Sequence, residues 1–391
     1  MGTKAPRNIR IEALRLVAIC SIAIFHSFQP LFARMTDLMG PGLVPGAGDA
    51  ASLVAATPAV AGMLGFINLF GAYGNCVFFA ISGMFLIPSA ARASREAGYL
   101  RDQLARTARR AAVILLSVAF YAAVALIVNA RVVPLPGVSL HETGWLIGGL
   151  EFIWVYLAML AITPLIGWLW ERCRARVGLT VLIVAAIYLV NAYIAFVSPG
   201  NEVRGLLEWR KLMSAASYGA AFIAGGALSE VLSRKGLSYR VASAALAGAA
   251  SLALVGEIWL AANGRGDLMA ATSFKSTSAI SFALAWLSLA VAAHPEAPRG
   301  DHPVAAPLIT RAAGSILGFY IAQSMFYALW RAAVDKLMSL AFAGGSSFNA
   351  TIGIIDLVAA GIAGSLAVVA VLIAIDALTR MPLLRLIRLQ R

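Results

Sequence analysis

An acid, a guanidinium group and an imidazole occupy one apolar segment near the start of the chain. They are Glu12, Arg15 and His26, within residues 10–32. In a helix of this segment, Arg15 and His26 would share a face, about three turns and roughly 16 Å apart. Glu12 precedes Arg15 by three residues, a spacing that allows an ion pair along the helix. Ionisable groups in such a segment usually face a cavity or a pathway, although a signal-anchor helix with one buried histidine is the simpler alternative.

Six arginines lie between residues 92 and 110, and Arg106, Arg109 and Arg110 gather at the start of an apolar run. Two interpretations are open. The arginines could set membrane topology and attract anionic lipid head groups. They could also bind the phosphates of a nucleotide-like donor, because guanidinium groups fork onto phosphate oxygens.

Further polar residues within apolar runs are candidates for substrate contacts. Glu151 is an acid expected at membrane depth, where it needs a partner or a proton. Ser82 is a candidate nucleophile, although a hydrogen bond from its hydroxyl to the helix carbonyl four residues earlier is the favoured interpretation. The remaining candidates are Asn75, Trp154, Tyr320 and Gln323.

The elements that position these residues are predicted to be membrane-spanning helices. The chain is 61% hydrophobic and 13% charged, whereas soluble domains carry about 25% charged residues. Its long unbroken apolar runs do not fit the short alternating strands of a β-barrel. We therefore expect an all-α, polytopic transmembrane helical bundle of about ten spans. They are residues 11–32, 65–88, 109–130, 145–170, 177–197, 214–233, 241–262, 276–294, 313–333 and 351–378.

Charge distribution predicts the orientation and the location. Most of the 31 Lys and Arg residues fall in alternate loops, which favours two cytoplasmic termini in a multi-pass protein of the plasma or inner membrane. The same pattern explains the net charge of +13 without nucleic acid. The basic C-terminal residues, from Arg380 onward, are expected at the inner membrane surface. The three cysteines show neither a disulfide framework nor a metal-binding spacing, so we expect no metal.

One domain is expected over residues 1–391, with no added soluble domain and no cleavable signal peptide. Within it, residues 10–32 carry the first-helix motif and residues 33–64 form an outer loop. Residues 75–110 hold the second span and the basic inner loop.

Several short motifs, taken in order, resemble one family. An acid, Leu-Arg, ten intervening residues and a His resemble the first-helix motif of the acyltransferase 3 family, whose members are integral membrane acyltransferases, often O-acetyltransferases of cell-surface glycans. A Phe-Phe-x-x-Ser-Gly element, an Arg-x-x-Arg pair, a Thr-Pro step and a Gly-x-Tyr-Ile element follow. The matching residues are Glu12, Leu14, Arg15, His26, Phe78, Phe79, Ser82, Gly83, Arg106, Arg109, Thr163, Pro164, Gly318, Tyr320 and Ile321.

Three departures from the family pattern bear on the acceptor more than on the reaction. The fourth-span motif usually reads His-Leu-Trp-Phe, and residues 149–152 here read Gly-Leu-Glu-Phe. The late motif usually ends in His, and Gln323 stands at that place. The proline that often follows the inner arginines is absent.

The resemblance implies acetyl transfer from cytoplasmic acetyl-CoA to a hydroxyl of a cell-envelope glycan or glycolipid. His26 would be the general base, since its ordinary pKa lies near neutrality. Arg15 and the three inner arginines would hold the phosphates of coenzyme A, with Glu12 orienting Arg15. Asn75, Ser82 or Tyr320 could polarise the thioester carbonyl.

Two other classes of function fit the same residues. A proton-coupled secondary transporter of a small solute or glycan precursor could use Glu12, Arg15, His26 and Glu151, but we find no clear internal symmetry. A structural or assembly protein would use its polar residues only to hold helices together.

Overall fold

The computed structural model describes residues 8–39, 49–142, 144–197, 206–273, 277–297 and 305–387, without the side chains of residues 206–211. These residues form helices and no strand. The helices are α1 (Ile9–Leu38), α2 (Ala50–Ala55), α3 (Pro58–Ala93), α4 (Tyr99–Arg131), α5 (Gly144–Gly149), α6 (Glu151–Arg172), α7 (Arg176–Ala192), η1 (Tyr193–Val197), α8 (Leu206–Ser233), α9 (Tyr239–Ala262), α10 (Gly266–Thr272), α11 (Ala279–Ala293), α12 (Ala305–Gly314), α13 (Ile316–Met325), α14 (Tyr327–Ser346), α15 (Ala350–Leu378) and α16 (Arg380–Leu386).

The all-α polytopic bundle predicted from the sequence is confirmed, with fewer spans than expected. Within the described ranges, eight helices are long and apolar enough to cross a membrane, or nine if α12 and α13 are counted as one bent span. The expected span at residues 276–294 is the helix α11, whose 15 residues reach only about 22 Å, less than a bilayer core of about 30 Å.

Two expected segments have different boundaries. Residues 313–333 are not one helix, because α12 and α13 meet at an angle of 51° and a new helix, α14, begins at Tyr327. The expected outer loop, residues 33–64, is partly helical. It contains the end of α1, all of α2 and the start of α3, and its residues 40–48 lie outside the described part of the chain.

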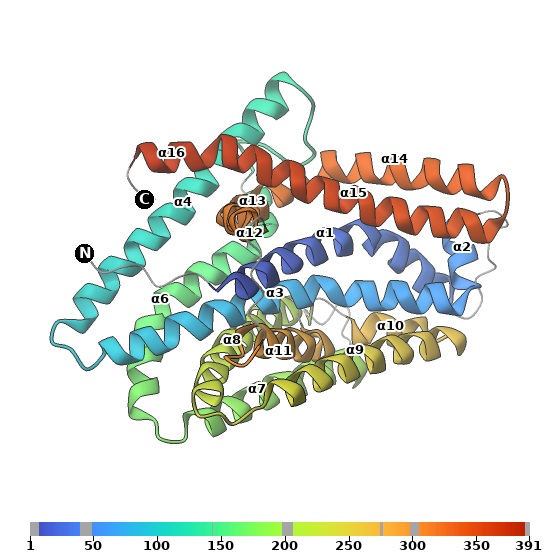
Figure 1. Ribbon diagram of the computed structural model, residues 1–391. Coiled ribbons are helices and arrows are strands. Elements are labelled where there is room, and N and C mark those ends of the chain that lie inside the picture. Colours follow the sequence, from blue (N-terminus) through green and yellow to red (C-terminus); the bar gives the residue numbers. More distant parts are fainter. Residues whose placement is uncertain are drawn as a thin grey trace.

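Helices α1 and α3 run through the middle of the bundle (Figure 1). In this view α14 and α15 cover them on one side, and α8, α9 and α11 cover them on the other. Glycines allow this packing. A Cβ atom on Gly83 of α3 would lie 1.7 Å from the Phe222 carbonyl oxygen of α8, and one on Gly225 of α8 would lie 1.9 Å from the Ala80 carbonyl oxygen. Only glycine lets two helix backbones approach this closely.

The peripheral helices present apolar side chains to their surroundings. Val181 and Leu189 of α7 are 63% and 71% exposed, and Leu252 of α9 is 75% exposed. Such surfaces are stable against lipid chains, which need no polar partner. The protein is therefore a multi-pass membrane protein.

Candidate active site

The first turns of α1 form the ion pair predicted from the sequence. The side chain of Asn8 caps the helix by accepting a hydrogen bond from the Arg10 backbone N–H at 3.1 Å. One turn further, Nη1 of Arg15 lies 3.0 Å from Oε2 and 3.2 Å from Oε1 of Glu12. Glu12 is buried, whereas 28% of the Arg15 side chain is exposed. Glu12 therefore orients a guanidinium group that retains free donors.

Three of the predicted site residues line one cavity of about 310 Å³. They are His26 of α1, Asn75 of α3 and Glu151 at the first residue of α6. The cavity joins α1, α3, α6 and α8, and its other polar lining residues are Gln29, Ser214 and Tyr218. Asn75 donates a hydrogen bond from Nδ2 to the Tyr218 hydroxyl oxygen at 3.0 Å, which fixes its amide at the cavity wall.

Close contact between α1 and α3 shapes this cavity. A Cβ atom on Gly71, which lines the cavity, would lie 2.6 Å from the Phe25 ring. The Phe25 ring in turn lies 4.9 Å from the His26 imidazole, measured between ring centroids. Glycine at residue 71 thus leaves room for the aromatic ring that packs beside the imidazole.

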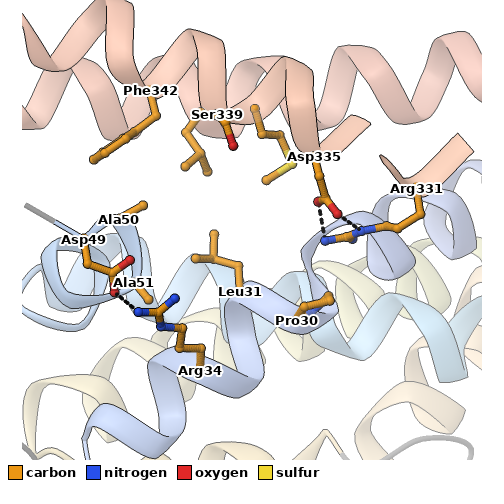
Figure 2. Close-up of a pocket in the computed structure, with 12 residues that line it drawn as sticks. Pro30, Leu31, Arg34, Asp49, Ala50, Ala51, Arg331, Asp335, Ser339 and Phe342 are labelled. Carbon is orange, nitrogen blue, oxygen red and sulfur yellow. Dashed lines mark hydrogen bonds and ion pairs between the residues drawn. The ribbon is translucent and has the colours of Figure 1, made fainter. Parts of the chain in front are cut away.

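An arginine from α14 supports the backbone of His26. Pro30 has no N–H group, so the His26 carbonyl, four residues earlier, loses its usual helix partner. Nη1 of Arg331 donates to this carbonyl and to that of Ser27. Arg331 is itself paired with Asp335 one turn along α14, with Nε and Oδ2 2.9 Å apart (Figure 2).

Aromatic side chains of the Phe-Phe-x-x-Ser-Gly element pack in a cluster next to the cavity. The rings of Phe79 and Tyr218 stack at 4.7 Å, and those of Phe152 and Tyr320 stack at 4.5 Å. Phe152 joins the two pairs, since its ring lies 5.0 Å from Phe79 and 5.9 Å from Tyr218. Phe78 packs against the second pair, 5.2 Å from Phe152 and 5.3 Å from Tyr320. The two phenylalanines of the motif therefore pack helices together, and Phe79 supports Tyr218 at the cavity.

Four predicted site residues lie away from the cavity lining. The Ser82 hydroxyl donates to the Phe78 carbonyl oxygen at 2.9 Å, as the structural alternative for this residue predicts. Trp154 donates from its indole to the Leu146 carbonyl oxygen at 2.9 Å. Tyr320 is buried in the aromatic cluster, and its hydroxyl has no partner in the described residues. Gln323 is buried and accepts a hydrogen bond at its backbone oxygen from the Trp330 indole.

The inner arginines lie apart from the His26 cavity. Arg106, Arg109 and Arg110 are exposed on the first half of α4 and form no hydrogen bond or ion pair within the described residues. Figure 1 shows the start of α4 at the same end of the bundle as the start of α1 and the end of α3. Their guanidinium donors are therefore free for an anion at that end.

The structure adds site residues that sequence reasoning did not find. Tyr218, Ser214 and Gln29 line the cavity, and Arg331 binds the His26 backbone. Pro30 within the first apolar segment was an available signal, because a proline in a helix leaves one carbonyl in need of a donor.

Arg380, the first of the C-terminal basic residues, is buried within the protein. Arg380 is 1% exposed, and its Nε and Nη2 bind the two carboxylate oxygens of Asp376 at 2.6 and 2.8 Å. Tyr121 donates to the same carboxylate at 2.7 Å, and Ser117 accepts from Arg380. Because this network pairs both charges within the protein, the Arg380 guanidinium group is not available to a lipid head group.

The fold and the cavity define a class of protein: a polytopic helical membrane protein with a polar interior site that contains an imidazole. A family model, described as an acyltransferase domain, matches residues 8–375. The chain therefore belongs to the acyltransferase 3 family, as its motifs predicted, and is a membrane acyltransferase. No curated protein and no solved structure matches the chain.

Proposed function

We propose that the protein is an O-acetyltransferase of the cell membrane. It moves an acetyl group from acetyl-CoA, bound at the cytoplasmic side, to a hydroxyl of a cell-envelope glycan or glycolipid. His26 acts as the general base. The observation that carries this proposal is the cavity in which the imidazole, the Asn75 amide and the Glu151 carboxylate meet, in a chain of an acyltransferase family.

The reaction needs a proton acceptor and a polarised carbonyl. The imidazole of His26 takes the proton of the acceptor hydroxyl while the hydroxyl oxygen attacks the thioester carbonyl carbon. The carbon–sulfur bond then breaks, and coenzyme A leaves with the proton that the imidazolium returns. Asn75 lines the cavity, and the second N–H of its amide, beyond the one given to Tyr218, is suited to stabilise the oxyanion of the tetrahedral intermediate.

The donor would approach from the end of the bundle where α1 begins. Arg15, together with Arg106, Arg109 and Arg110, offers guanidinium donors for the phosphates of coenzyme A. Arg15 lies about 16 Å from His26 along α1, a distance that suits an extended pantetheine arm. Glu12 holds Arg15 in place for this contact.

The experiment is acyl transfer by the purified protein with radiolabelled acetyl-CoA and an envelope extract. Wild-type protein should label a glycan or glycolipid, and His26→Ala should lower the rate by at least about 100-fold, the usual contribution of a general base. The matched control is His294→Ala, which changes a histidine at the end of α11, outside the cavity.

A wild-type rate in His26→Ala would overturn the role of the imidazole. Uptake of an envelope precursor into proteoliposomes without any acyl donor would favour the transporter alternative instead.

A further inference from the structure

A second polar cavity lies beside the second half of α1, one turn beyond His26. It has a volume of about 470 Å³ and lies between α1, α2, α14 and α15. We call it the α1–α14 pocket and define it by Arg34, Asp49, Arg331, Asp335, Ser339 and Phe342 (Figure 2).

Two ion pairs provide the polar surface of the α1–α14 pocket. Nη2 of Arg34 lies 3.1 Å from Oδ2 of Asp49, and on the other side of the pocket Arg331 pairs with Asp335 along α14 (Figure 2). The Arg34 and Asp335 side chains are 66% and 48% exposed, so each pair retains donors and lone pairs for a ligand. The charges of the lining residues cancel, and the pocket therefore favours a neutral ligand over an anion.

Apart from Ser339, the remaining lining surface is apolar. Leu31, Met338 and Phe342 line the pocket, and Leu31 lies between the two ion pairs (Figure 2). A sugar ring combines hydroxyls, which both donate and accept hydrogen bonds, with C–H faces that pack on apolar side chains. Oriented polar groups on an apolar lining are what such a ligand requires.

The pocket connects to His26 through two contacts. Pro30 lines the pocket and follows His26 by four residues, so the two stand on nearly the same side of α1, roughly 6 Å apart along its axis. Arg331 also lines the pocket, and its Nη1 binds the His26 carbonyl oxygen. The part of a ligand that lies against Pro30 would thus be about one helical turn along α1 from the proposed base.

We infer that the α1–α14 pocket holds the sugar portion of the acceptor, as a neutral polyhydroxylated ligand. This inference rests on the proposed function, because it assigns the acceptor of that reaction to a place in the fold. It also gives the two substrates separate binding sites. The anionic donor binds to the exposed arginines of α4, and the neutral acceptor binds in the pocket, whose charges cancel.

The test breaks the more exposed ion pair from each side with Arg34→Gln and Asp49→Asn. The donor is radiolabelled acetyl-CoA. The acceptors are the intact glycolipid fraction of an envelope extract and, in a second arm, the glycans released from it. Each variant removes charge-assisted hydrogen bonds to sugar hydroxyls, so the apparent KM for the acceptor should rise about tenfold. The KM for acetyl-CoA should stay within about twofold of the wild-type value, because no donor contact is removed.

The control is an ion pair of the same type on α10. Arg265 binds Asp267 through Nε and Nη2 at 3.0 and 2.8 Å, and both side chains are exposed. The hydrogen bonds from Arg265 lower the pKa of the Asp267 carboxyl, so this pair is charged at neutral pH. Arg265→Gln and Asp267→Asn should change neither KM.

The outcomes separate the two proposals. Active wild-type protein with an unchanged acceptor KM in both pocket variants overturns the pocket assignment, as does a rise confined to the KM for acetyl-CoA. Wild-type protein that labels neither acceptor overturns the proposed function itself. A raised KM for the intact glycolipid alone supports the pocket with a lipid-linked sugar as its source. If the two variants do not fold, Ser339→Ala tests the pocket assignment by the same measurement. The apparent KM for the acceptor should then rise about threefold.

Discussion

At the scale of single residues, the backbone around His26 depends on Arg331. Pro30 leaves the His26 carbonyl without a helix donor, and a carbonyl buried without a partner costs free energy. The guanidinium group supplies donors to this carbonyl and to that of Ser27 from a helix some 300 residues later. Asp335 fixes the orientation of the guanidinium group. The imidazole is therefore positioned partly through its own main chain.

We predict that Arg331→Gln lowers kcat for acyl transfer by about tenfold or more, because a small displacement of a catalytic group strongly slows a reaction. Pro30→Ala restores an N–H at residue 30 that can donate to the His26 carbonyl. In the Pro30→Ala background, Arg331→Gln should therefore lower kcat by a smaller factor than it does in the wild-type chain. The measurement is kcat of the four proteins at saturating donor and acceptor.

Arg331→Lys provides the conservative control, since it keeps the charge but lacks the planar fork. We expect kcat of Arg331→Lys to lie between the values of the wild-type protein and Arg331→Gln. Equal losses from Arg331→Gln in both backgrounds would contradict a role in capping the His26 carbonyl.

At the scale of helices, glycines set the distance between α3 and its neighbours. Gly83 belongs to the Phe-Phe-x-x-Ser-Gly element, and its contact with the Phe222 carbonyl explains a small residue there without any role in catalysis. Ser82, bonded to the carbonyl of Phe78, also acts within its own helix. This element therefore packs the helices beside the site and lies outside the cavity lining.

We predict that Gly83→Ala destabilises the protein by about 1–3 kcal/mol, because the added methyl forces the α3 and α8 backbones apart. The matched control is Gly248→Ala in α9, where an added Cβ would meet no atom within 4 Å. There the substitution should stabilise the helix by up to about 1 kcal/mol through helix propensity. The free energy of unfolding in detergent measures both, and equal effects at the two glycines would contradict the close-packing explanation.

At the scale of the whole molecule, the sequence predicted what depends on neighbours along one helix. The Glu12–Arg15 pair follows from their spacing, and the helical bundle follows from long apolar runs. Residues fixed by contacts between distant segments were not predictable. Arg331 falls within the predicted span of residues 313–333 and was not singled out, and Arg380 was predicted to belong to a basic tail. Their roles depend on partners across the bundle, namely the His26 carbonyl for Arg331 and Tyr121 and Ser117 with Asp376 for Arg380.

The candidate site residues also divide into those whose place the sequence predicts and those whose place depends on contacts between helices. His26 and Glu151 stand out as ionisable residues in apolar runs, and the structure places both at one cavity. Trp154 and Gln323 stand out equally as polar residues, but the Trp154 indole and the Gln323 backbone are bonded within the helical packing. Residue type alone cannot separate a cavity lining from a packing contact, because the direction of each side chain depends on neighbouring helices.

The arrangement of the two candidate substrate sites predicts a two-sided enzyme. Cys173 follows α6 and is partly exposed. Arg95, in the connection between α3 and α4, forms an ion pair with Glu171, so Cys173 lies at the same end of the bundle as the start of α4. The other cysteines, Cys20 and Cys76, lie within α1 and α3. A membrane-impermeant maleimide that labels Cys173 would therefore identify vesicles with the basic end outside.

We predict that external acetyl-CoA supports acyl transfer only in vesicles whose Cys173 is labelled from outside. The phosphates of the donor carry charges that do not cross a bilayer, so the donor must reach the arginines from their own side. External acceptor should be used in vesicles of the opposite orientation, loaded internally with acetyl-CoA. Cys173→Ser should abolish labelling and leave transfer unchanged, because this thiol belongs to neither site. Transfer from external acetyl-CoA in vesicles that protect Cys173 would show that the donor enters at the other end, next to the α1–α14 pocket.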